Sequence, residues 1–413
     1  MLANRIFFCK FAHNNNNNNG REYETLLYNI INMAEITLNE LKQTFSRRLR
    51  TARLMCGLSQ AELVAKMKEL AEDFPALYKS VSSTAVERYE KAIMFPESSS
   101  ILVTFAEALN TNVGDLTRPF TISIDDNFSF RKKSKLGKKR IDVVKMKVQQ
   151  GIEKYVEIER ITGDEPKFDA FFNDIVVRNA EDARLVANEL RKKWNLGDGP
   201  ISQPIVVLEE HGVKVIEVEE DPELFDGTST IVEGLPVVVL NKCESFSPES
   251  KHTFSPERRN LTLFHELGHQ IMNIPDDISD KEKENLCNVF ANEMLIPSEK
   301  FLTIFGKKRP FITFVELKDV QLSFGISARA LMMKAYQLGV INKHRYIKFC
   351  IDMNDPANEK IRKMLDGSSR PCEHTSRYKR LVFRALSTEA ISTSKAAEML
   401  DISVDEVRER LIF

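Results

Sequence analysis

The sequence predicts an α+β protein that is mostly α-helical and divided into several domains. The chain has 413 residues, more than one ordinary hydrophobic core accommodates. Residues 38–118 carry hydrophobic side chains at a helical period, which favours an all-α bundle. From residue 180 onward amphipathic stretches alternate with short runs rich in valine and isoleucine, a pattern typical of helices mixed with strands.

The composition restricts the classes of function. Hydrophobic content of 42% and charged content of 29% indicate a globular protein,. The net charge of −1 means that any nucleic-acid surface must be a local patch,. The six cysteines are scattered without a CxxC pair, which predicts neither a thiolate cluster nor a disulfide framework and suits a reducing cytoplasm. We expect no membrane segment, because no apolar run approaches the roughly 18–20 residues required.

Residues 1–35 are expected to be a disordered leader. The run from Asn14 to Asn19 cannot bury a core,. The start also lacks the apolar region and cleavage site of a signal peptide. Met33 begins a more ordinary stretch, MAEITLNELKQTF, and translation could start there.

Residues 38–118 are predicted to form a bundle of short helices. Apolar residues recur at positions 41, 45, 49, 54, 58, 63 and 67,. Gly57 ends the first helix, and Ser59 with Glu62 forms a capping box for the next,. Further helices follow at SSTAVERYEK and ILVTFAEALN. Short helices with tight turns are typical of a helix-turn-helix bundle.

Residues 119–175 are interpreted as a basic helical connector. The stretch RKKSKLGKKRIDVVKMK, residues 131–147, carries nine lysines and arginines and a single acidic residue, Asp142. A solvated helix face or linker is the favoured explanation. Contact with phosphates is the alternative.

Residues 176–345 combine helices with strands. AEDARLVANELRKKWNLG predicts an amphipathic helix ending at Gly197,. IVVLEEHGVKVIEVEED predicts a helix, a break at Gly212 and a strand,. STIVEGLPVVVLN is a hairpin signal around Glu233-Gly234, and its PVVVLN part could hold a peptide substrate as an added edge strand,.

The stretch LTLFHELGHQIM, residues 261–272, carries a metal-binding pattern. His265 and His269 are four positions apart and differ by about 40° in azimuth, so both imidazoles can bind one metal ion. Glu266 is rotated by about 100° and can act as general base towards a water molecule. A core helix with two hydrogen-bonded histidines is the alternative. That alternative explains neither Glu266 nor the small Gly268, which permits close approach of a neighbouring backbone.

A third ligand must come from elsewhere, because catalytic zinc usually has three protein ligands. The following helix, residues 281–295, offers Glu284 and Glu293. They are nine positions apart and point to opposite faces of that helix, so only one can face the metal. Tyr336 and His344 are candidates for a second donor to a developing oxyanion, although a structural role is favoured for both.

Residues 180–300 resemble the ImmA/IrrE family of metallopeptidases. The matching stretches are RKKWNLGDGPI, LEEHGVKVIEV, FDGTST, PVVVLNK, ERRNLTLFHELGH and ENLCNVFANEMLIP. The resemblance implies a zincin-like α+β domain that binds Zn²⁺ through His265, His269 and Glu293, with Glu266 as catalytic base. It also implies proteolysis of a helix-turn-helix repressor. Two departures are Asn260-Leu261, where the family tends to have Arg-Phe, and Lys334, where the family usually has arginine.

Residues 45–118 resemble the XRE family of helix-turn-helix regulators. The match covers FSRRLRTARLMCGLSQAELVAKM and VSSTAVERYEKAIMFPESSSILVTFAEALNTNVGDL. The resemblance places a recognition helix at residues 82–90. It implies DNA contacts from Ser83, Thr84, Glu87 and Arg88, and phosphate contacts from Gln60 and Lys91. A departure is the insertion KELAEDFPALYKS, residues 68–80, at the turn. A bundle used only for dimerisation is the alternative.

Residues 346–413 are expected to be a C-terminal helical tail. The stretch RYKRLVFRALSTEAISTSKAAEMLDISVDEV is similar to the tail of regulators that join the two families. FGISARALMMKAYQLGVI and ISTSKAAEMLDISVDEVRERL each resemble a small helix-turn-helix,.

The combined pattern predicts a cytoplasmic homodimeric regulator with two activities. It would bind a double-stranded DNA operator and hydrolyse peptide bonds in a repressor or in itself. Two alternatives are a non-proteolytic transcription factor whose zincin-like domain senses a ligand, and an antitoxin-like regulator that binds a protein partner. The presence of Glu266 favours the protease, because a sensor has no need of a base.

Overall fold

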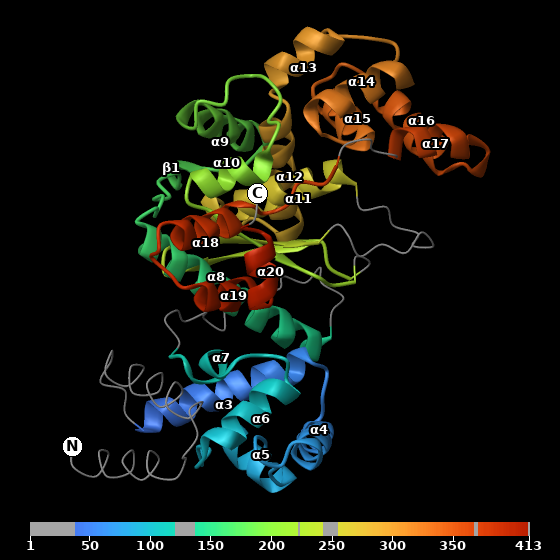
Figure 1. The fold of residues 1–413 in the computed structure, drawn as a ribbon. Coiled ribbons are helices and arrows are strands. Elements are labelled where there is room, and N and C mark those ends of the chain that lie inside the picture. The colour runs from blue at the N-terminus through green and yellow to red at the C-terminus, as the bar shows by residue number, and fades with distance from the viewer. Residues whose placement is uncertain (1–37, 120–136, 222–223, 243–254, 367–370, 412–413) are drawn as a thin grey trace. The chain divides into compact units, whose positions relative to one another are not determined.

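The computed structural model describes residues 38–119, 137–221, 224–242, 255–366 and 371–411. The chain forms two compact units, Met1–Thr121 and Ile122–Phe413, and Figure 1 shows their elements. The architecture is α+β and mostly helical, as the sequence predicts. The expected leader, residues 1–35, lies outside the described residues.

The first unit is a bundle of helices. They are α3 (Leu38–Met55), α4 (Gln60–Asp73), α5 (Ser83–Glu90), α6 (Ser99–Ala108) and α7 (Val113–Thr117). Phe45 of α3 is fully buried and packs edge-on against Tyr89 of α5 and Phe105 of α6. The predicted capping box is present: the Ser59 hydroxyl accepts from the Glu62 backbone N–H, and the Glu62 carboxylate accepts from the Ser59 backbone N–H. Helix α4 therefore begins where the capping box in the sequence predicts.

The insertion at residues 68–80 lengthens the second helix and adds a turn. Helix α4 continues to Asp73, and the chain then turns through Phe74 and Leu77, both more than half exposed. The Lys79 backbone N–H donates to the buried Thr104 hydroxyl of α6 at 2.9 Å. The end of the insertion is therefore fixed to the bundle before α5 begins.

The second unit is built on a three-stranded sheet with the order β2-β4-β3. Strand β2 (Lys214–Val218) is parallel to β4 (Leu235–Asn241), and β3 (Gly227–Val232) is antiparallel to β4. A second sheet pairs β1 (Phe172–Val176) with β5 (Met272–Asn273). The predicted hairpin is confirmed: Glu233 and Gly234 join β3 to β4 with φ of 50° and 81°, the backbone of a tight hairpin turn.

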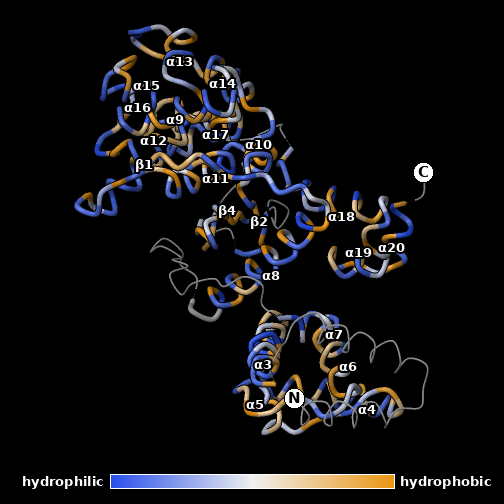
Figure 2. The backbone as a smooth tube through the Cα atoms, turned by 90° about the vertical axis from the view of Figure 1, so that its left-hand side faces the viewer, coloured by the Kyte–Doolittle hydropathy of each residue, from blue (hydrophilic) through white to orange (hydrophobic). Residues whose placement is uncertain are grey.

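Both faces of the three-stranded sheet are covered. Along β4, Val237 and Val239 face one core, whereas Val238 and Leu240 face the other. This alternation explains the continuous apolar run PVVVL, because a strand buried on both faces needs hydrophobic residues at every position. Figure 2 shows these hydrophobic stretches on β2 and β4.

Helix α8 (Lys138–Thr162) covers one face of the sheet and is not a connector. Val144, Val148 and Ile152 are fully buried in the same cluster as Ile216 and Val239. The interpretation of residues 119–175 as a solvated linker is therefore wrong for α8. Apolar residues recur at four-residue spacing among the basic residues of this stretch and form one face of the helix,. Residues 131–136 lie outside the described part.

Helices cover the other face and extend the core beyond it. In chain order they are α9 (Ala180–Lys193), α10 (Pro204–Glu210), α11 (Pro256–Ile271), α12 (Asp280–Leu295), α13 (Ser298–Phe305), α14 (Phe314–Phe324), α15 (Ala328–Gln337), α16 (Lys343–Asn354), the short η1 (Pro356–Asn358) and α17 (Glu359–Asp366). Phe349 of α16 and Leu365 of α17 belong to the main core. The expected boundary at residue 345 is therefore not a boundary in the structure.

The C-terminal helices pack on α8. They are α18 (Arg377–Ser387), α19 (Thr393–Leu400) and α20 (Val404–Glu409), and their apolar residues cluster with Ile158 of α8. Arg377 pairs with the buried Glu159 of α8, which also accepts from Lys214 of β2 at 2.6 Å. A charged network thus ties the C-terminal helices to the sheet.

Two further findings bear on the compositional expectations. No described helix is both long and apolar enough to cross a membrane. Cys56 and Cys350 are free thiols, whereas Cys372 is disulfide-bonded, a bond that the scattered cysteines did not predict.

Candidate metal site

Helix α11 presents the two histidines on one face. It begins at Pro256, where the Ser255 hydroxyl accepts from the Arg258 backbone N–H, a regular N-cap. His265 is buried, and its Nε2 lies 3.1 Å from Nε2 of His269, one turn later. Both ring nitrogens thus point towards the same small region, as the four-residue spacing predicts.

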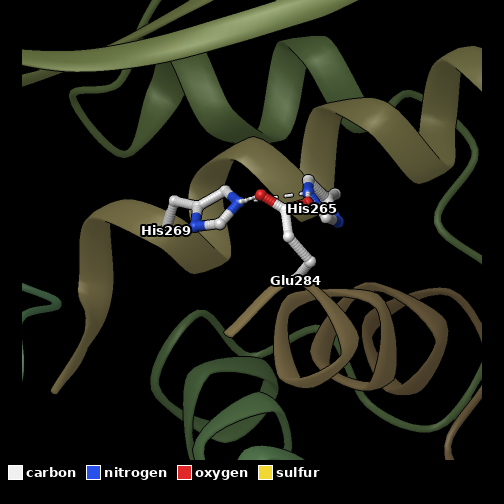
Figure 3. A group of neighbouring side chains, drawn as sticks. All are labelled: His265, His269 and Glu284. Atoms are coloured by element: carbon white, nitrogen blue, oxygen red, sulfur yellow. Dashed lines mark hydrogen bonds and ion pairs between the residues drawn. The ribbon is translucent and has the colours of Figure 1, made fainter. Parts of the chain in front are cut away.

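The third member of the group is Glu284, from α12. Its carboxylate lies between the two imidazoles in Figure 3. One oxygen is 3.2 Å from Nε2 of His265 and the other is 3.5 Å from Nε2 of His269. Neighbouring ligands of a tetrahedral zinc ion are about 3.3 Å apart when metal–ligand distances are about 2.0–2.1 Å. The three side chains therefore form a group that could hold a metal ion.

Glu293, the expected third ligand, is engaged elsewhere. Its carboxylate accepts from Lys334 of α15 at 2.5 Å and from the backbone N–H of Ser298 at 2.7 Å. It is 1% exposed and lies half a helical turn away from the face of α12 that carries Glu284,. Our expectation of Glu293 in the metal group is therefore corrected in favour of Glu284.

Lys334 is a structural partner of Glu293. Burial lowers the pKa of Lys334 to about 8, against the opposing effect of the Glu293 carboxylate. Burial would raise the pKa of Glu293, but Lys334 and Ser298 bring it below its ordinary value. The pair is thus held ionised inside the protein. The departure at Lys334 concerns this ion pair, in which a lysine takes the place usual for arginine.

A close approach of α11 and α12 brings Glu284 to the histidines. A Cβ atom added at Gly268 would lie 2.9 Å from the ring of Phe290 on α12, closer than Cβ atoms are normally found. Phe290 is fully buried, so neighbours pack against its ring. Gly268 thus admits a close neighbour, but that neighbour is a side chain of α12 and not the backbone that we expected.

Glu266 points to the sheet and not to the other three side chains. The Ser229 hydroxyl on β3 donates to a Glu266 carboxylate oxygen at 2.8 Å. Next to it, Gly227 brings β3 against α11, because a Cβ there would lie 2.8 Å from the methyl group of Thr262. Ser229 lies in the quoted FDGTST stretch, but nothing in the sequence linked it to Glu266.

The strand at the edge of the described sheet beside α11 is β3. Strand β4, which contains PVVVLN, is paired on both sides and has no free edge. Strand β3 is at the edge of the described sheet and runs beside α11. The prediction that PVVVLN adds a peptide strand is therefore wrong, because its central place in the sheet depends on long-range pairing.

The two candidates for a second donor are not members of the group of three. The Tyr336 ring on α15 stacks on Tyr346 with centroids 5.4 Å apart. His344 is exposed near the start of α16. The packing role that we favoured for Tyr336 agrees with its stacking.

The comparison with known families bears on this unit. Residues 208–336 match the IrrE N-terminal-like domain family, Peptidase M78. The match begins at the end of α10, runs through the three-stranded sheet, α11 and α12, and ends in α15. It supports the ImmA/IrrE part of the resemblance and a zincin-like metallopeptidase fold for these residues. No curated protein matches the chain.

The residues proposed for DNA contact lie on and beside α5. Ser83, Thr84, Glu87, Arg88 and Lys91 are exposed, whereas Val86 and Tyr89 face the core. Glu87 and Lys91 form an exposed ion pair at 2.5 Å. Gln60 differs from expectation: its side-chain amide donates to Glu90 at 2.8 Å. This bond uses one of the two N–H groups of the Gln60 amide,, so a phosphate contact through the second N–H stays a prediction.

Proposed function

We propose that the second unit is a zinc-dependent endopeptidase. The observation that carries this proposal is the convergence of His265, His269 and Glu284 beside a glutamate, Glu266, that takes no part in the group. Three protein ligands leave one position of a tetrahedral ion open, the arrangement of catalytic zinc rather than structural zinc. The match to the Peptidase M78 family supports the same reading.

The chain's own residues supply the proton chemistry. A bound Zn²⁺ would act as a Lewis acid, polarising the scissile carbonyl and making an attacking water more acidic. Glu266 would take a proton from that water and return it to the leaving amine. The Ser229 hydroxyl, bonded to Glu266, would keep the carboxylate turned towards the sheet side of the site, where the substrate backbone would lie.

Strand β3 would hold the substrate. An extended peptide paired with its free edge would run alongside α11, because β3 itself lies against that helix,. Main-chain pairing selects an extended segment and not a particular sequence. A protein substrate such as a helix-turn-helix repressor, or a segment of the chain itself, would therefore have to expose one extended stretch.

The first unit would bind an operator in double-stranded DNA. Helix α5 presents short polar side chains and Arg88 on its exposed face, which suits insertion in the major groove. A homodimer on a two-fold operator would place two such helices about one helical turn apart. Helix α15 belongs to the stretch FGISARALMMKAYQLGVI, which also resembles a small helix-turn-helix. It is largely buried, so we do not propose that it binds DNA.

Glu266→Gln tests the protease. The variant should bind zinc as the wild type does, because Glu266 is not in the ligand group, and should lose all cleavage of candidate repressors or of the chain itself. Zinc content by elemental analysis and fragments by mass spectrometry give the two readouts. Wild-type protein that binds zinc and yields no Glu266-dependent fragment would favour the non-proteolytic regulator.

DNA binding needs its own measurement. Titration of labelled promoter DNA of the chain's own gene, at two salt concentrations, should show specific binding that Arg88→Ala weakens by about 1–3 kcal/mol. Lys91→Ala should lower affinity for all sequences alike. Equal affinity of the wild type for promoter and random DNA would contradict the regulator proposal and leave the zinc site untouched.

A further inference from the structure

Helix α12 supplies more than Glu284 to the metal group. The second ring nitrogen of each histidine also has a partner on this helix. Nδ1 of His265 lies 3.0 Å from the side-chain oxygen of Asn288, and Nδ1 of His269 lies 3.2 Å from Sγ of Cys287. Glu284, Cys287 and Asn288 thus lie within about one turn of α12,.

An acceptor at Nδ1 decides what Nε2 can do. A neutral imidazole carries one proton, so an acceptor bonded to Nδ1 holds the proton there and leaves the Nε2 lone pair for a metal. A carboxamide oxygen is a stronger acceptor than a thiol sulfur. Asn288 therefore fixes the proton on Nδ1 of His265 more strongly than Cys287 fixes the proton on Nδ1 of His269.

We infer that Asn288 is a positioning residue for His265, an inference that rests on the proposed zinc site. Glu284 and Asn288 are four positions apart and share a face of α12. The same turn of α12 consequently positions both the proposed ligand Glu284 and Asn288, the hydrogen-bond partner of His265. Any rotation of α12 would move both together, so its packing sets the geometry of the whole group.

Zinc affinity tests the inference. Asn288→Ala should raise the dissociation constant for Zn²⁺ about 10–100-fold, the usual effect of losing an outer partner of a histidine ligand. Asn288→Asp keeps an acceptor at the same place and should restore most of the affinity. Competition with a chromophoric chelator measures all variants. Asn285→Ala, at an exposed position of the same helix, is the matched control and should bind zinc as the wild type does.

A second measurement needs no variant. In the zinc-loaded wild-type protein, the Nδ1 proton of His265 should be visible by nuclear magnetic resonance and slow to exchange with solvent, because Asn288 shields it. A rapidly exchanging proton, or an Asn288→Ala protein with unchanged affinity, would overturn the inference while leaving the zinc site standing. A wild-type protein that binds no zinc would instead contradict the proposed function.

Discussion

At the scale of single residues, the choice between Glu284 and Glu293 is the decisive one. Glu284→Ala should weaken zinc binding sharply, because it removes one of the three proposed ligands,. Glu293→Ala should leave the ligand group intact but destabilise the fold by about 3–5 kcal/mol, since Lys334 would remain buried without its partner,. Zinc titration and urea unfolding of both variants separate the two effects.

The same pair offers an internal control. Replacing Glu293 and Lys334 together by leucine and methionine should be less destabilising than Glu293→Ala alone, because no unpaired charge stays in the core. Loss of zinc from a folded Glu293→Ala protein, with zinc retained by Glu284→Ala, would contradict the group described here.

The sequence predicts the two histidines of this site but not the third ligand. Residues four apart on one helix share a face whatever surrounds them, so His265 and His269 could be paired from spacing alone. The third ligand depends on how α12 is rotated, which is set by long-range packing around buried residues such as Phe290. Position along the chain made Glu284 and Glu293 equally possible. The resemblance to the ImmA/IrrE family favoured Glu293, which forms an ion pair with Lys334 in the structure.

At the scale of elements, the contact between α11 and α12 holds the site together. Gly268→Ala should destabilise the protein by about 1–3 kcal/mol, because the added methyl group meets the buried Phe290 ring at 2.9 Å,. It should also weaken zinc binding, since relief of the clash moves α12 and Glu284 away from the histidines. Urea unfolding and zinc titration provide both measurements.

Gly151→Ala is the matched control for Gly268→Ala. Gly151 is also a helical glycine, in α8, but the atom nearest to its added Cβ is the flexible tip of Ile216 at 3.3 Å. There the gain in helix propensity, up to about 1 kcal/mol, should equal or exceed the cost of the contact. Equal destabilisation by the two substitutions would mean that the close approach at Gly268 has no special role.

Strong local signals made most elements predictable. Three of these signals depend only on residues close together in the sequence, and the structure contains all three: the capping box at Ser59, the hairpin at Glu233-Gly234 and the break at Gly212. The sequence predicted a solvated linker in place of α8, because lysines and arginines dominate the start of this helix. Its apolar stripe of Val144, Val148 and Ile152 was visible at helical spacing, but only the fold shows that a sheet covers it.

At the scale of the whole molecule, the two units have separate cores. The residues of the first core all lie between Phe45 and Leu116, and those of the other clusters all follow residue 143. The first unit can therefore stay folded whatever happens to the second unit. The C-terminal helices belong to the second unit, because α18 packs on α8.

Arg377 at the start of α18 should therefore contribute to the stability of the second unit alone. It is 4% exposed and pairs with Glu159 and Asp164. Arg377→Ala should lower the unfolding free energy of that unit by about 1.5–3 kcal/mol, because it removes charge-assisted hydrogen bonds to Glu159 and Asp164 while Lys214 still pairs with Glu159,. Trp194, the single tryptophan of the chain, is buried in the second unit, so its fluorescence during urea unfolding reports this unit selectively.

Arg384→Ala is the control for Arg377→Ala on the same helix. Arg384 also pairs with Asp164, but its side chain is 56% exposed, and an exposed pair contributes only about 0–1 kcal/mol. The tryptophan transition should therefore shift clearly for Arg377→Ala and hardly for Arg384→Ala, while the proposed DNA binding by the first unit should stay unchanged in both. Equal shifts would mean that the buried network does not anchor the C-terminal helices. Weaker DNA binding in the Arg377→Ala protein would mean that the two units are energetically coupled.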